Sequence, residues 1–580
     1  MTRLLPITQN TDVTSVTVTT GGTALPGWVR LAALEVQRSV NRIPFARLQI
    51  DDGDPATADF AASASALFAA GQEITVEAGY HGEVVPIFSG VVLRQRLGVR
   101  DCSSWLEVEC RDVASKMTLS RRNRLFEEMT DSDVIAEILG EYGIGADLAA
   151  TEVTHPQLFQ YQATDWDFVM ARLDANGQFM AVEDGTLRSF IPELDPDAPV
   201  AEALFGANLI ELDAEFDARS QTGGIVARAW DPAAQAAGES EAADPGWILT
   251  GDQNDADMIG ATGRTGEEVW HGGALMADAL QAWADGALRR SRIAGARGRV
   301  RFQGFAPIML GQTLQLSGVG ARFNGGVLVT GLRHAISGNT WTLDVEFGAD
   351  PRTHAERFAI SAPPASALSP AVSGLQVGVV TAIADDPGGE HRVRIRLPVS
   401  APDGEGVWAR LATLDAGAER GTFFRPEVDD EVVVGFFNDD PAFPVILGAL
   451  HSSAQAPPEE PSAENHLKGY VSRTKLRLVF DDENGAVIVE TPAGNSVTLS
   501  DSDGGILLAD QNGNSIALTS DGITFDSAGG VIIAASGDVE IEGTNIGLAA
   551  NAELKAEGSA SAAVTSSGMV EVSGSLVKIN

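Results

Sequence analysis

Apolar and polar residues alternate along several short segments of the chain, a pattern typical of β-strands with one buried face. Leu106–Cys110 and Trp341–Phe347 alternate strictly, and Ile74–Val76 and Val327–Val329 are further strand candidates. Strict alternation predicts strands with one dry and one wet face. We therefore expect the first part of the chain to be built mainly on sheet.

Three helices are expected among these strands. Thr130 and Thr164 each begin a capping pattern with an acid three residues on, and Gly143 and Gly177 end the two segments. Their predicted apolar faces are Val134, Ile135, Ile138, Leu139 and Tyr142 in the first helix and Val169, Met170 and Leu173 in the second. The third helix, about 274–291, would present Met276, Leu280, Trp283 and Ala287, with Arg289, Arg290 and Arg292 placed to suit the helix dipole.

A second block, about 374–451, contains almost only strand and turn patterns. Strand candidates 378–383 and 392–397 flank the turn 385–389, and candidates 431–436 and 444–448 flank the turn 438–441. Roughly five short strands in so small a block favour a closed barrel, which has no exposed edges.

The third block is a series of short alternating segments broken by Gly, Asn and Asp. Gly494–Ser500 returns as Gly513–Thr519, and similar segments continue through Val531–Ile533, Val539–Ile541 and Val570–Val572. Repeats of this kind stack so that each unit contacts mainly its neighbours.

This third block has a weak core of its own. The expected inward positions are bulky early and small later: Leu476, Leu478, Phe480, Ile488, Leu499 and Leu507, then Ala550, Ala552, Ala556 and Ala560. Burial of Ala and Ser hardly offsets roughly 1–2 kcal/mol of backbone entropy per residue. Three copies wound around one axis would remove the difficulty and make a shaft that narrows toward the C-terminus; a single-chain solenoid or a disordered tail is the alternative.

Two proline-rich linkers, 361–370 and 452–467, separate the blocks. We predict three domains. The first covers 1–365 with α/β insertions around 125–200 and 270–295, the second covers 374–452, and the third covers 468–580. The predicted fold class is mainly β with a small α+β part.

Composition narrows the function. The chain has 62 glycines, 6% aromatic residues, and 80 acidic against 40 basic residues, for a formal net charge of −40. Such a surface repels nucleic acid and anionic lipid, so we expect no nucleic-acid partner and only mechanical contact with membranes.

The N-terminus, Met1–Asn10, has no extended apolar core, so no signal peptide is expected, and no apolar stretch is long enough for a spanning helix. Cys102 and Cys110 cannot make a disulfide framework, and a buried, reduced Cys110 is expected. We expect synthesis in the bacterial cytoplasm, followed by incorporation into a particle that is released or anchored at a membrane.

The second block resembles the OB-fold module of VgrG spikes and phage tail needle proteins. The resemblance rests on an ordered series of segments, in which the family has Gly where this chain has Asp429: Val377–Ile383, Arg392–Pro398, Val407–Leu411, Gly421–Phe437 and Asp440–Leu450. Thr164–Phe168, Ile87–Val92, and Phe323–Val329 followed by His334 resemble the N-terminal hub of these proteins. The end Leu576–Asn580 resembles their blunt needle ends.

The resemblance covers essentially the whole chain and implies a homotrimeric spike of a contractile injection system. The fold would comprise hub β-barrels, an OB-fold barrel and a C-terminal intertwined β-helix, or prism, that forms a needle. The hub would adapt a hexameric inner tube or its initiator, and the baseplate, to the needle. The needle would puncture a target envelope, bind a PAAR-type tip protein through Val577, Lys578, Ile579 and Asn580, and carry effector cargo. N-terminal details resemble extracellular, phage-tail-like systems more than type VI secretion spikes.

No enzyme is expected. The linker 452–467 is too short to hold a catalytic domain, and His-Glu-x-x-His, phosphate-loop and Gly-x-Ser-x-Gly motifs are absent from the sequence. Catalytic residues, cofactors and metals are therefore predicted to be none. His334 is expected to be a structural residue in a strand connection, Asp439-Asp440 a turn, and Asp501, Asp503, Asn512 and Asn514 turn residues rather than calcium ligands.

Two other functions remain open. A type VI secretion or phage tail spike would share these features, and a receptor-binding tail module would use the needle as a stalk. A cell-wall hydrolase is a third and weaker hypothesis.

Overall fold

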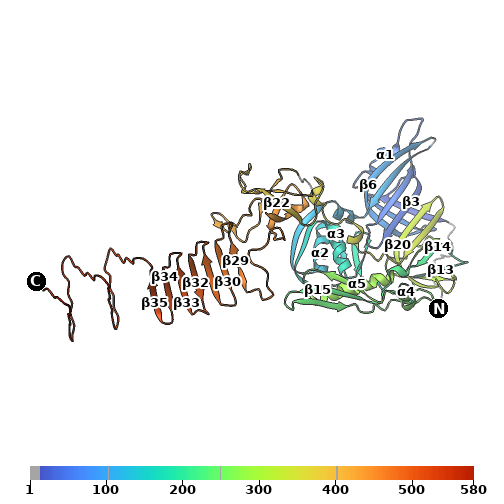
Figure 1. Ribbon diagram of the computed structural model, residues 1–580. Coiled ribbons are helices and arrows are strands. Elements are labelled where there is room, and N and C mark those ends of the chain that lie inside the picture. Colours follow the sequence, from blue (N-terminus) through green and yellow to red (C-terminus); the bar gives the residue numbers. More distant parts are fainter. Residues whose placement is uncertain (1–12, 102, 249, 400–402, 580) are drawn as a thin grey trace. The chain divides into compact units, whose positions relative to one another are not determined.

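The computed structural model describes residues 13–101, 103–248, 250–399 and 403–579. The chain divides into two compact units, residues 1–373 with 436–441, and residues 374–435 with 442–580. Both units are built mainly of strands, as the alternation predicts (Figure 1).

The first unit is organised by one 13-stranded sheet of order β14-β18-β21-β20-β3-β4-β7-β6-β5-β1-β2, to which β19 and then β13 are joined through β20. The four strand candidates of this region are confirmed within β5, β7, β20 and β21. The strands are β1 (Thr14–Thr20), β2 (Thr23–Ala24), β3 (Arg30–Ser39), β4 (Phe45–Asp51), β5 (Glu73–Tyr80), β6 (Glu83–Arg100), β7 (Ser103–Arg111), β13 (Ala201–Leu204), β14 (Leu209–Phe216), β18 (Ala296–Gln303), β19 (Thr313–Ser317), β20 (Gly325–Ser337) and β21 (Thr340–Phe347).

This sheet surrounds two hydrophobic cores. Leu48, Ile74 and Phe88 belong to the first core, and Val300, Phe302 and Leu314 belong to the second. The long strands β20 and β21 supply residues to both cores. The two barrels expected in the hub therefore correspond to two cores of one continuous sheet, and the domain boundary at 365 stays a prediction.

A helical module with its own core lies between β7 and β13 in the chain. Thr130 and Thr164 each accept a hydrogen bond from the backbone N–H three residues on, and Gly143 ends α2 with φ of 67°. The predicted caps and apolar faces of both helices are thereby confirmed, although Tyr142 is only half-buried. The elements are η2 (Val113–Thr118), β8 (Arg121–Thr130), α2 (Asp131–Tyr142), β9 (Gly145–Asp147), β10 (Thr154–Thr164), α3 (Asp165–Ala175), β11 (Phe179–Glu183) and β12 (Thr186–Phe190).

A second small sheet, β16-β15-β17, packs against helix α5 and was not expected from the sequence. Its strands are short and frequently carry Ala and Glu, and their β-branched residues are limited to Ile225, Val226 and Val269, so the usual strand pattern is weak. Its elements are η3 (Ala218–Ser220), β15 (Ile225–Asp231), β16 (Ala236–Glu241), α4 (Asp255–Thr262), β17 (Glu267–His271) and α5 (Ala277–Ile293). The remaining short helices of the unit are α1 (Ala61–Ala64), η1 (Ala66–Phe68), α6 (His354–Arg357), η4 (Pro364–Ala367) and η5 (Phe437–Asp439).

Helix α5 is present, and its predicted stripe is confirmed in part: Leu280 is buried and Trp283 packs, partly buried, against the same core. Leu280, Ala284 and Leu288 are buried, whereas Met276 lies at the N-cap and is 40% exposed. Arg290 and Arg292 are also buried, and they donate to the backbone carbonyls of Asp174 and Thr222, each at 2.7 Å. These arginines tie α5 to neighbouring segments, a role that the helix-dipole interpretation missed.

Of two single residues considered in the sequence, His334 lies elsewhere than expected, whereas the burial of Cys110 is confirmed. His334 lies inside β20 rather than in a connection; it is fully buried, and its Nδ1 accepts from Trp341 Nε1 at 3.3 Å. Burial and the nearby Arg38 lower the pKa of His334 to about 3, so the imidazole is neutral. Cys110 is buried as a free thiol, and Cys102 lies outside the described residues, as does the N-terminal segment 1–10 considered for a signal peptide.

The second unit begins with a closed barrel of order β22-β23-β24-β28-β27, which confirms the five-stranded prediction. Val380, Ile395 and Val432 are among its fully buried side chains. Asp429, where the family has Gly, adopts φ of 72°, a left-handed conformation that Asp tolerates better than most residues. The strands are β22 (Gln376–Ala382), β23 (Val393–Arg396), β24 (Val407–Leu411), β25 (Ala416–Gly417), β26 (Arg420–Gly421), β27 (Glu431–Phe436) and β28 (Pro444–Ala449).

A seven-stranded antiparallel sheet follows, and its strands pair in chain order from β29 to β35 (Figure 1). Beyond β35, residues 527–579 form no helix or strand, so the strands predicted at 531–533, 539–541 and 570–572 are wrong for an isolated chain. The strands are β29 (Leu467–Val471), β30 (Arg477–Asp481), β31 (Ala486–Glu490), β32 (Ser496–Ser500), β33 (Gly505–Ala509), β34 (Ser515–Thr519) and β35 (Gly522–Asp526).

Among the described residues, no helix is long and apolar enough to cross a membrane.

The close approach between Gly177 and Gly286 yields a stability prediction. A Cβ on Gly286 would lie 2.7 Å from Gly177 Cα, a backbone atom that cannot move aside easily. We expect Gly286→Ala to destabilise the first unit by about 1–3 kcal/mol and to lower its calorimetric unfolding midpoint by several degrees. The matched control is Gly140→Ala in α2, where a Cβ meets nothing within 4 Å; this change should be neutral or stabilising. Equal midpoints for the two variants would contradict the packing argument.

Candidate functional site

The register of the C-terminal sheet divides its side chains between two faces. Directly opposed residues in an antiparallel pair point to the same side of the sheet. Leu478 lies opposite Val489, Val489 opposite Val497, and this correspondence continues strand by strand to Phe525. One side of the sheet can therefore be followed from β29 to β35 without interruption.

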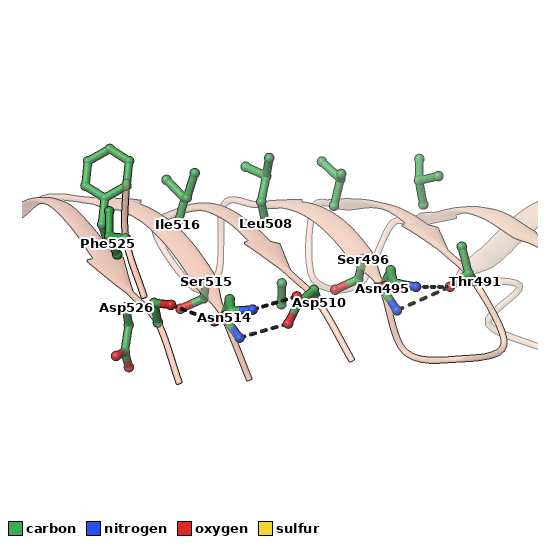
Figure 2. Close-up of a pocket in the computed structure, with 15 residues that line it drawn as sticks. Thr491, Asn495, Ser496, Leu508, Asp510, Asn514, Ser515, Ile516, Phe525 and Asp526 are labelled. Carbon is green, nitrogen blue, oxygen red and sulfur yellow. Dashed lines mark hydrogen bonds between the residues drawn. The ribbon is translucent and has the colours of Figure 1, made fainter. Parts of the chain in front are cut away.

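This side, which we call the apolar face, carries two bulky apolar residues on every strand from β30 to β35. Most of them are 36–68% exposed. Figure 2 shows Leu508, Ile516 and Phe525 standing in a row on this side. The members of the apolar face are Tyr470, Leu478, Phe480, Val487, Val489, Val497, Leu499, Ile506, Leu508, Ile516, Leu518, Ile523 and Phe525.

The opposite side, the polar face, is dominated from β32 onward by Ser, Thr and small residues. Ser496, Ser515 and Thr524 are typical members, and only Leu507 is bulky and apolar in this part of the sheet. A sheet with one apolar and one hydroxyl-rich face is ready to pack on one side and to be wet on the other.

The faces correct part of the predicted inward set. Leu478, Phe480 and Leu499 lie on the apolar face, but Ile488 and Leu507 point to the polar face. Each of these two is the middle residue of three consecutive bulky apolar residues, so alternation alone could not decide its direction. The apolar residues Ile506, Leu508, Ile516 and Phe525 were missed, although the register of the repeat could have identified them.

Asparagines link successive hairpins at one end of the strands. The Asn495 side chain donates to Thr491 Oγ1 at 3.0 Å, and its Oδ1 accepts from the backbone N–H of Gln511 at 3.2 Å. Asn514 repeats this arrangement: it donates to Asp510 Oδ2 at 2.8 Å (Figure 2). Its Oδ1 accepts from the backbone N–H of Ala528 at 3.0 Å. The Asn of each Gly-Asn-Ser repeat therefore hydrogen-bonds both within its own turn and to the next turn. We call this pair of bonds the staple.

The turn 510–514 accounts for two of the four residues considered as calcium ligands, Asn512 and Asn514. The Asp510 carboxylate accepts from the backbone and side chain of both Asn512 and Asn514 at 2.8–3.1 Å. These bonds, led by that of the Asn514 side chain, lower the pKa of Asp510 to about 2. Among the described residues no group of three His, Cys, Asp or Glu side chains is arranged to hold a metal ion.

In the first unit, the cluster most reminiscent of catalytic chemistry surrounds Asp131. Its buried carboxylate accepts from Arg172 at 2.5 Å and from Asn176 at 2.8 Å, and lies 3.1 Å from His155 Nε2. Burial alone would raise the pKa of Asp131, but Arg172, Asn176 and His155 outweigh it and lower that pKa. The carboxylate is thus held in place by several donors at the N-terminus of α2, an arrangement that favours a structural role.

The predicted tip residues stay a prediction. Val577 and Ile579 are exposed, at 46% and 91%, and no described contact brings the end of the chain together with another segment. Asn580 lies outside the described residues.

Three protein-family models match the chain in sequence order. The model described as the Alg8 N-terminal domain matches residues 10–338, more than half of the chain. The type VI secretion system/phage-baseplate injector OB domain matches residues 376–451, which contain the closed barrel. The phage baseplate V C-terminal trimerisation domain matches residues 486–580, and so includes the apolar face from β31 onward.

Solved structures also show similarities. A 43 kDa tail protein of prophage MuSo2 from Shewanella oneidensis is 13% identical, with a TM-score of 0.45 over 58% of this chain and 98% of that one. The tail protein from Neisseria meningitidis is 17% identical, with a TM-score of 0.43 over 58% and 97%. The lidded PdpA–VgrG complex from Francisella gives 9% identity and a TM-score of 0.40 over 89% and 81%. These similarities are too distant to support a functional argument.

Leu507 and Leu508 provide a matched test of the apolar face. They are neighbours with almost equal exposure, 41% and 39%, but they point to opposite sides of the sheet. If the apolar face packs against other copies, Leu508→Asp would bury a carboxylate in an apolar contact, which costs several kcal/mol, and would dissociate the oligomer. Leu507→Asp should leave the mass measured by light scattering unchanged. Equal behaviour of the two variants would contradict the assignment of faces.

The staple predicts a local effect of Asn514. We expect Asn514→Ala to increase hydrogen exchange at the Ala528 amide, which loses its acceptor, by about tenfold or more. The control is Asn512→Ala, because the Asn512 side chain also donates to Asp510, whereas the Ala528 amide donates to Asn514. Exchange resolved by fragmentation mass spectrometry would distinguish the two variants.

The Asp510 pKa predicts an acid-sensitive turn. A carboxylate whose folded pKa is about 2, below the ordinary value of about 3.9, stabilises the fold above pH 4 and loses that contribution as the pH falls toward 2. We expect protection of the Asn512 and Asn514 amides to decrease over this window, and Asp510→Asn to remove the pH dependence. Unchanged protection at pH 2 in the unmodified chain would contradict the prediction.

Proposed function

We propose how this chain works from its family: it belongs to the Alg8 N-terminal domain family. It is a VgrG-type spike protein of a phage tail-like or type VI secretion injection system. Three copies form the spike. The N-terminal unit adapts a hexameric inner tube and the baseplate to three-fold symmetry, the barrel joins it to the C-terminal needle, and the needle punctures the target envelope when the sheath contracts.

The apolar face is the observation that carries this proposal. A monomeric protein rarely exposes a continuous apolar patch larger than a few hundred Å². Here two bulky residues per strand continue through six successive strands, at 36–68% exposure for most of them. The match to a trimerisation domain over residues 486–580 supports two further copies of the same chain as the cover of this face.

The energies agree with a stable trimer. Covering each half-exposed side chain is worth roughly 1–1.5 kcal/mol, so the apolar face supplies on the order of 10–20 kcal/mol per chain. This exceeds most estimates of the cost of association, about 4–15 kcal/mol. The hydroxyl-rich polar faces would then form the wet outside of a three-walled prism.

The same reasoning accounts for residues 527–579. They form no strand in the single chain, yet Ile532, Ile541 and Val570 continue the apolar pattern, at 51–91% exposure. Intertwining of three chains would supply the missing strand partners. Val577, Lys578, Ile579 and Asn580 would end the needle and bind a PAAR-type tip protein, and cargo would travel with it.

The proposed role is mechanical, without catalysis or a cofactor. The Asp131 carboxylate is bound by several donors, and the net charge of −40 disfavours nucleic acid and anionic membranes as binding partners. We propose that the chain is made in the cytoplasm and functions in a contractile particle, and the choice between a released and an anchored particle stays a prediction.

Native mass spectrometry of the full-length chain tests the proposal. We expect a trimer that binds one hexameric ring of the particle's inner-tube protein, and we expect Leu508→Asp to give monomers. Incubation of the trimer with peptidoglycan should release no fragments.

A monomer at micromolar concentration would overturn the spike function. Release of soluble cell-wall fragments would overturn only the proposal that the chain is not catalytic. Binding of surface glycan or receptor by a trimer that ignores tube rings would instead favour a receptor-binding tail module.

A further inference from the structure

A loop of the barrel displays apolar side chains that the barrel does not use. The loop 412–430 lies between β24 and β27 and carries the short hairpin β25–β26. Leu414 is 95% exposed, Phe423 is 90% exposed and Phe424 is 61% exposed. Exposed single apolar residues are common, but three on one short loop form a patch that calls for a partner.

The loop is held in a defined shape. The backbone N–H of Thr422 donates to the carbonyl of Asp415 at 2.9 Å, and Thr413 Oγ1 donates to the same carbonyl at 2.9 Å. Arg420 contacts the Asp415 carboxylate at 2.7 Å. Leu414 and Phe423 flank this bonded hairpin, so their presentation is ordered before any partner arrives, which lowers the entropic cost of binding.

One side of the loop already contacts the C-terminal sheet. The Phe424 ring lies 4.6 Å from the Tyr470 ring, centroid to centroid, and Arg473 pairs with Glu427 at 3.0 Å. Tyr470 is the β29 member of the apolar face, since it lies opposite Leu478. The apolar face therefore continues from the sheet onto the loop.

We propose that Leu414 and Phe423 pack on a second copy of this chain, against the start of its apolar face at Tyr470, Leu478 and Phe480. Phe424 contacts Tyr470 of its own chain but leaves it 48% exposed, whereas Leu414 and Phe423 are almost fully exposed and need a surface that their own chain does not supply. Three loops would then form a collar that closes the barrel end of the prism. This inference rests on the trimer of the proposed function, and it adds a contact that lies outside the residues matched by the trimerisation domain.

Site-specific photocrosslinking in the full-length chain tests the collar. With p-benzoylphenylalanine at Phe423, illumination should give a covalent dimer whose crosslinked peptide includes residues 467–481. The matched control carries the same probe at Thr524 on the polar face, which should give no dimer. A trimer without a Phe423 crosslink would overturn the collar and leave the spike function intact, whereas a monomeric chain would overturn both.

A double variant provides an independent readout. Leu414→Ser with Phe423→Ser should leave the trimer mass unchanged, because the apolar face is intact, but should raise the rate of tryptic cleavage at Arg420–Gly421 at least tenfold. Leu368→Ser, a change at an 86% exposed leucine in the other unit, should not alter that rate. Cleavage at Arg420 that is equally fast in the unmodified trimer would overturn the proposal, as would a Phe423 probe that labels lipid vesicles instead of a second chain.

Discussion

The C-terminal sheet has one apolar face that a single chain cannot cover, and the rest of the molecule depends on this constraint. Its strands pair in chain order, so the backbone hydrogen bonds are largely satisfied within one polypeptide, whereas burial of Leu, Ile, Val and Phe side chains requires other copies. Strand pairing is thus local and assembly is hydrophobic. Each chain can therefore form its own sheet through β35 first and then associate with other copies through the preformed apolar face.

Sequence reasoning succeeded where one local signal determined the structure. The caps at Thr130 and Thr164 and the turns around the five-stranded barrel are read from a few adjacent residues. It failed where tertiary packing determines which residues are buried and which segments pair as strands. The buried stripe of α5 includes Arg290 and Arg292 because backbone carbonyls accept from them, and no periodicity reveals such acceptors. The sheet β15–β17 was missed because its strands have few β-branched residues and frequent Ala and Glu, so their alternation is weak.

The same limit on prediction from sequence applies to the candidate site. The repeat at Gly494 and Gly513 predicted stacked strands, and bulky residues were expected to point inward. Which residues do so depends on register, and within an apolar triplet such as Ile506–Leu508 one residue of slip reverses the answer. The staples at Asn495 and Asn514 join turns of neighbouring hairpins, so they help to set that register by hydrogen bonds rather than by side-chain size.

The repeat also limits how such a protein can change its length. A hairpin contains two strands, so inserting or deleting a whole hairpin keeps every later side chain on its side of the wall. The Gly-Asn-Ser unit returns after such a pair of strands and brings its own staple with it. Duplication of this unit would extend the shaft in fixed steps. Insertion of a single residue within a strand would move the later side chains of that strand to the opposite face of the sheet. The hairpin is therefore the increment in which evolution, or a protein engineer, can lengthen or shorten the wall.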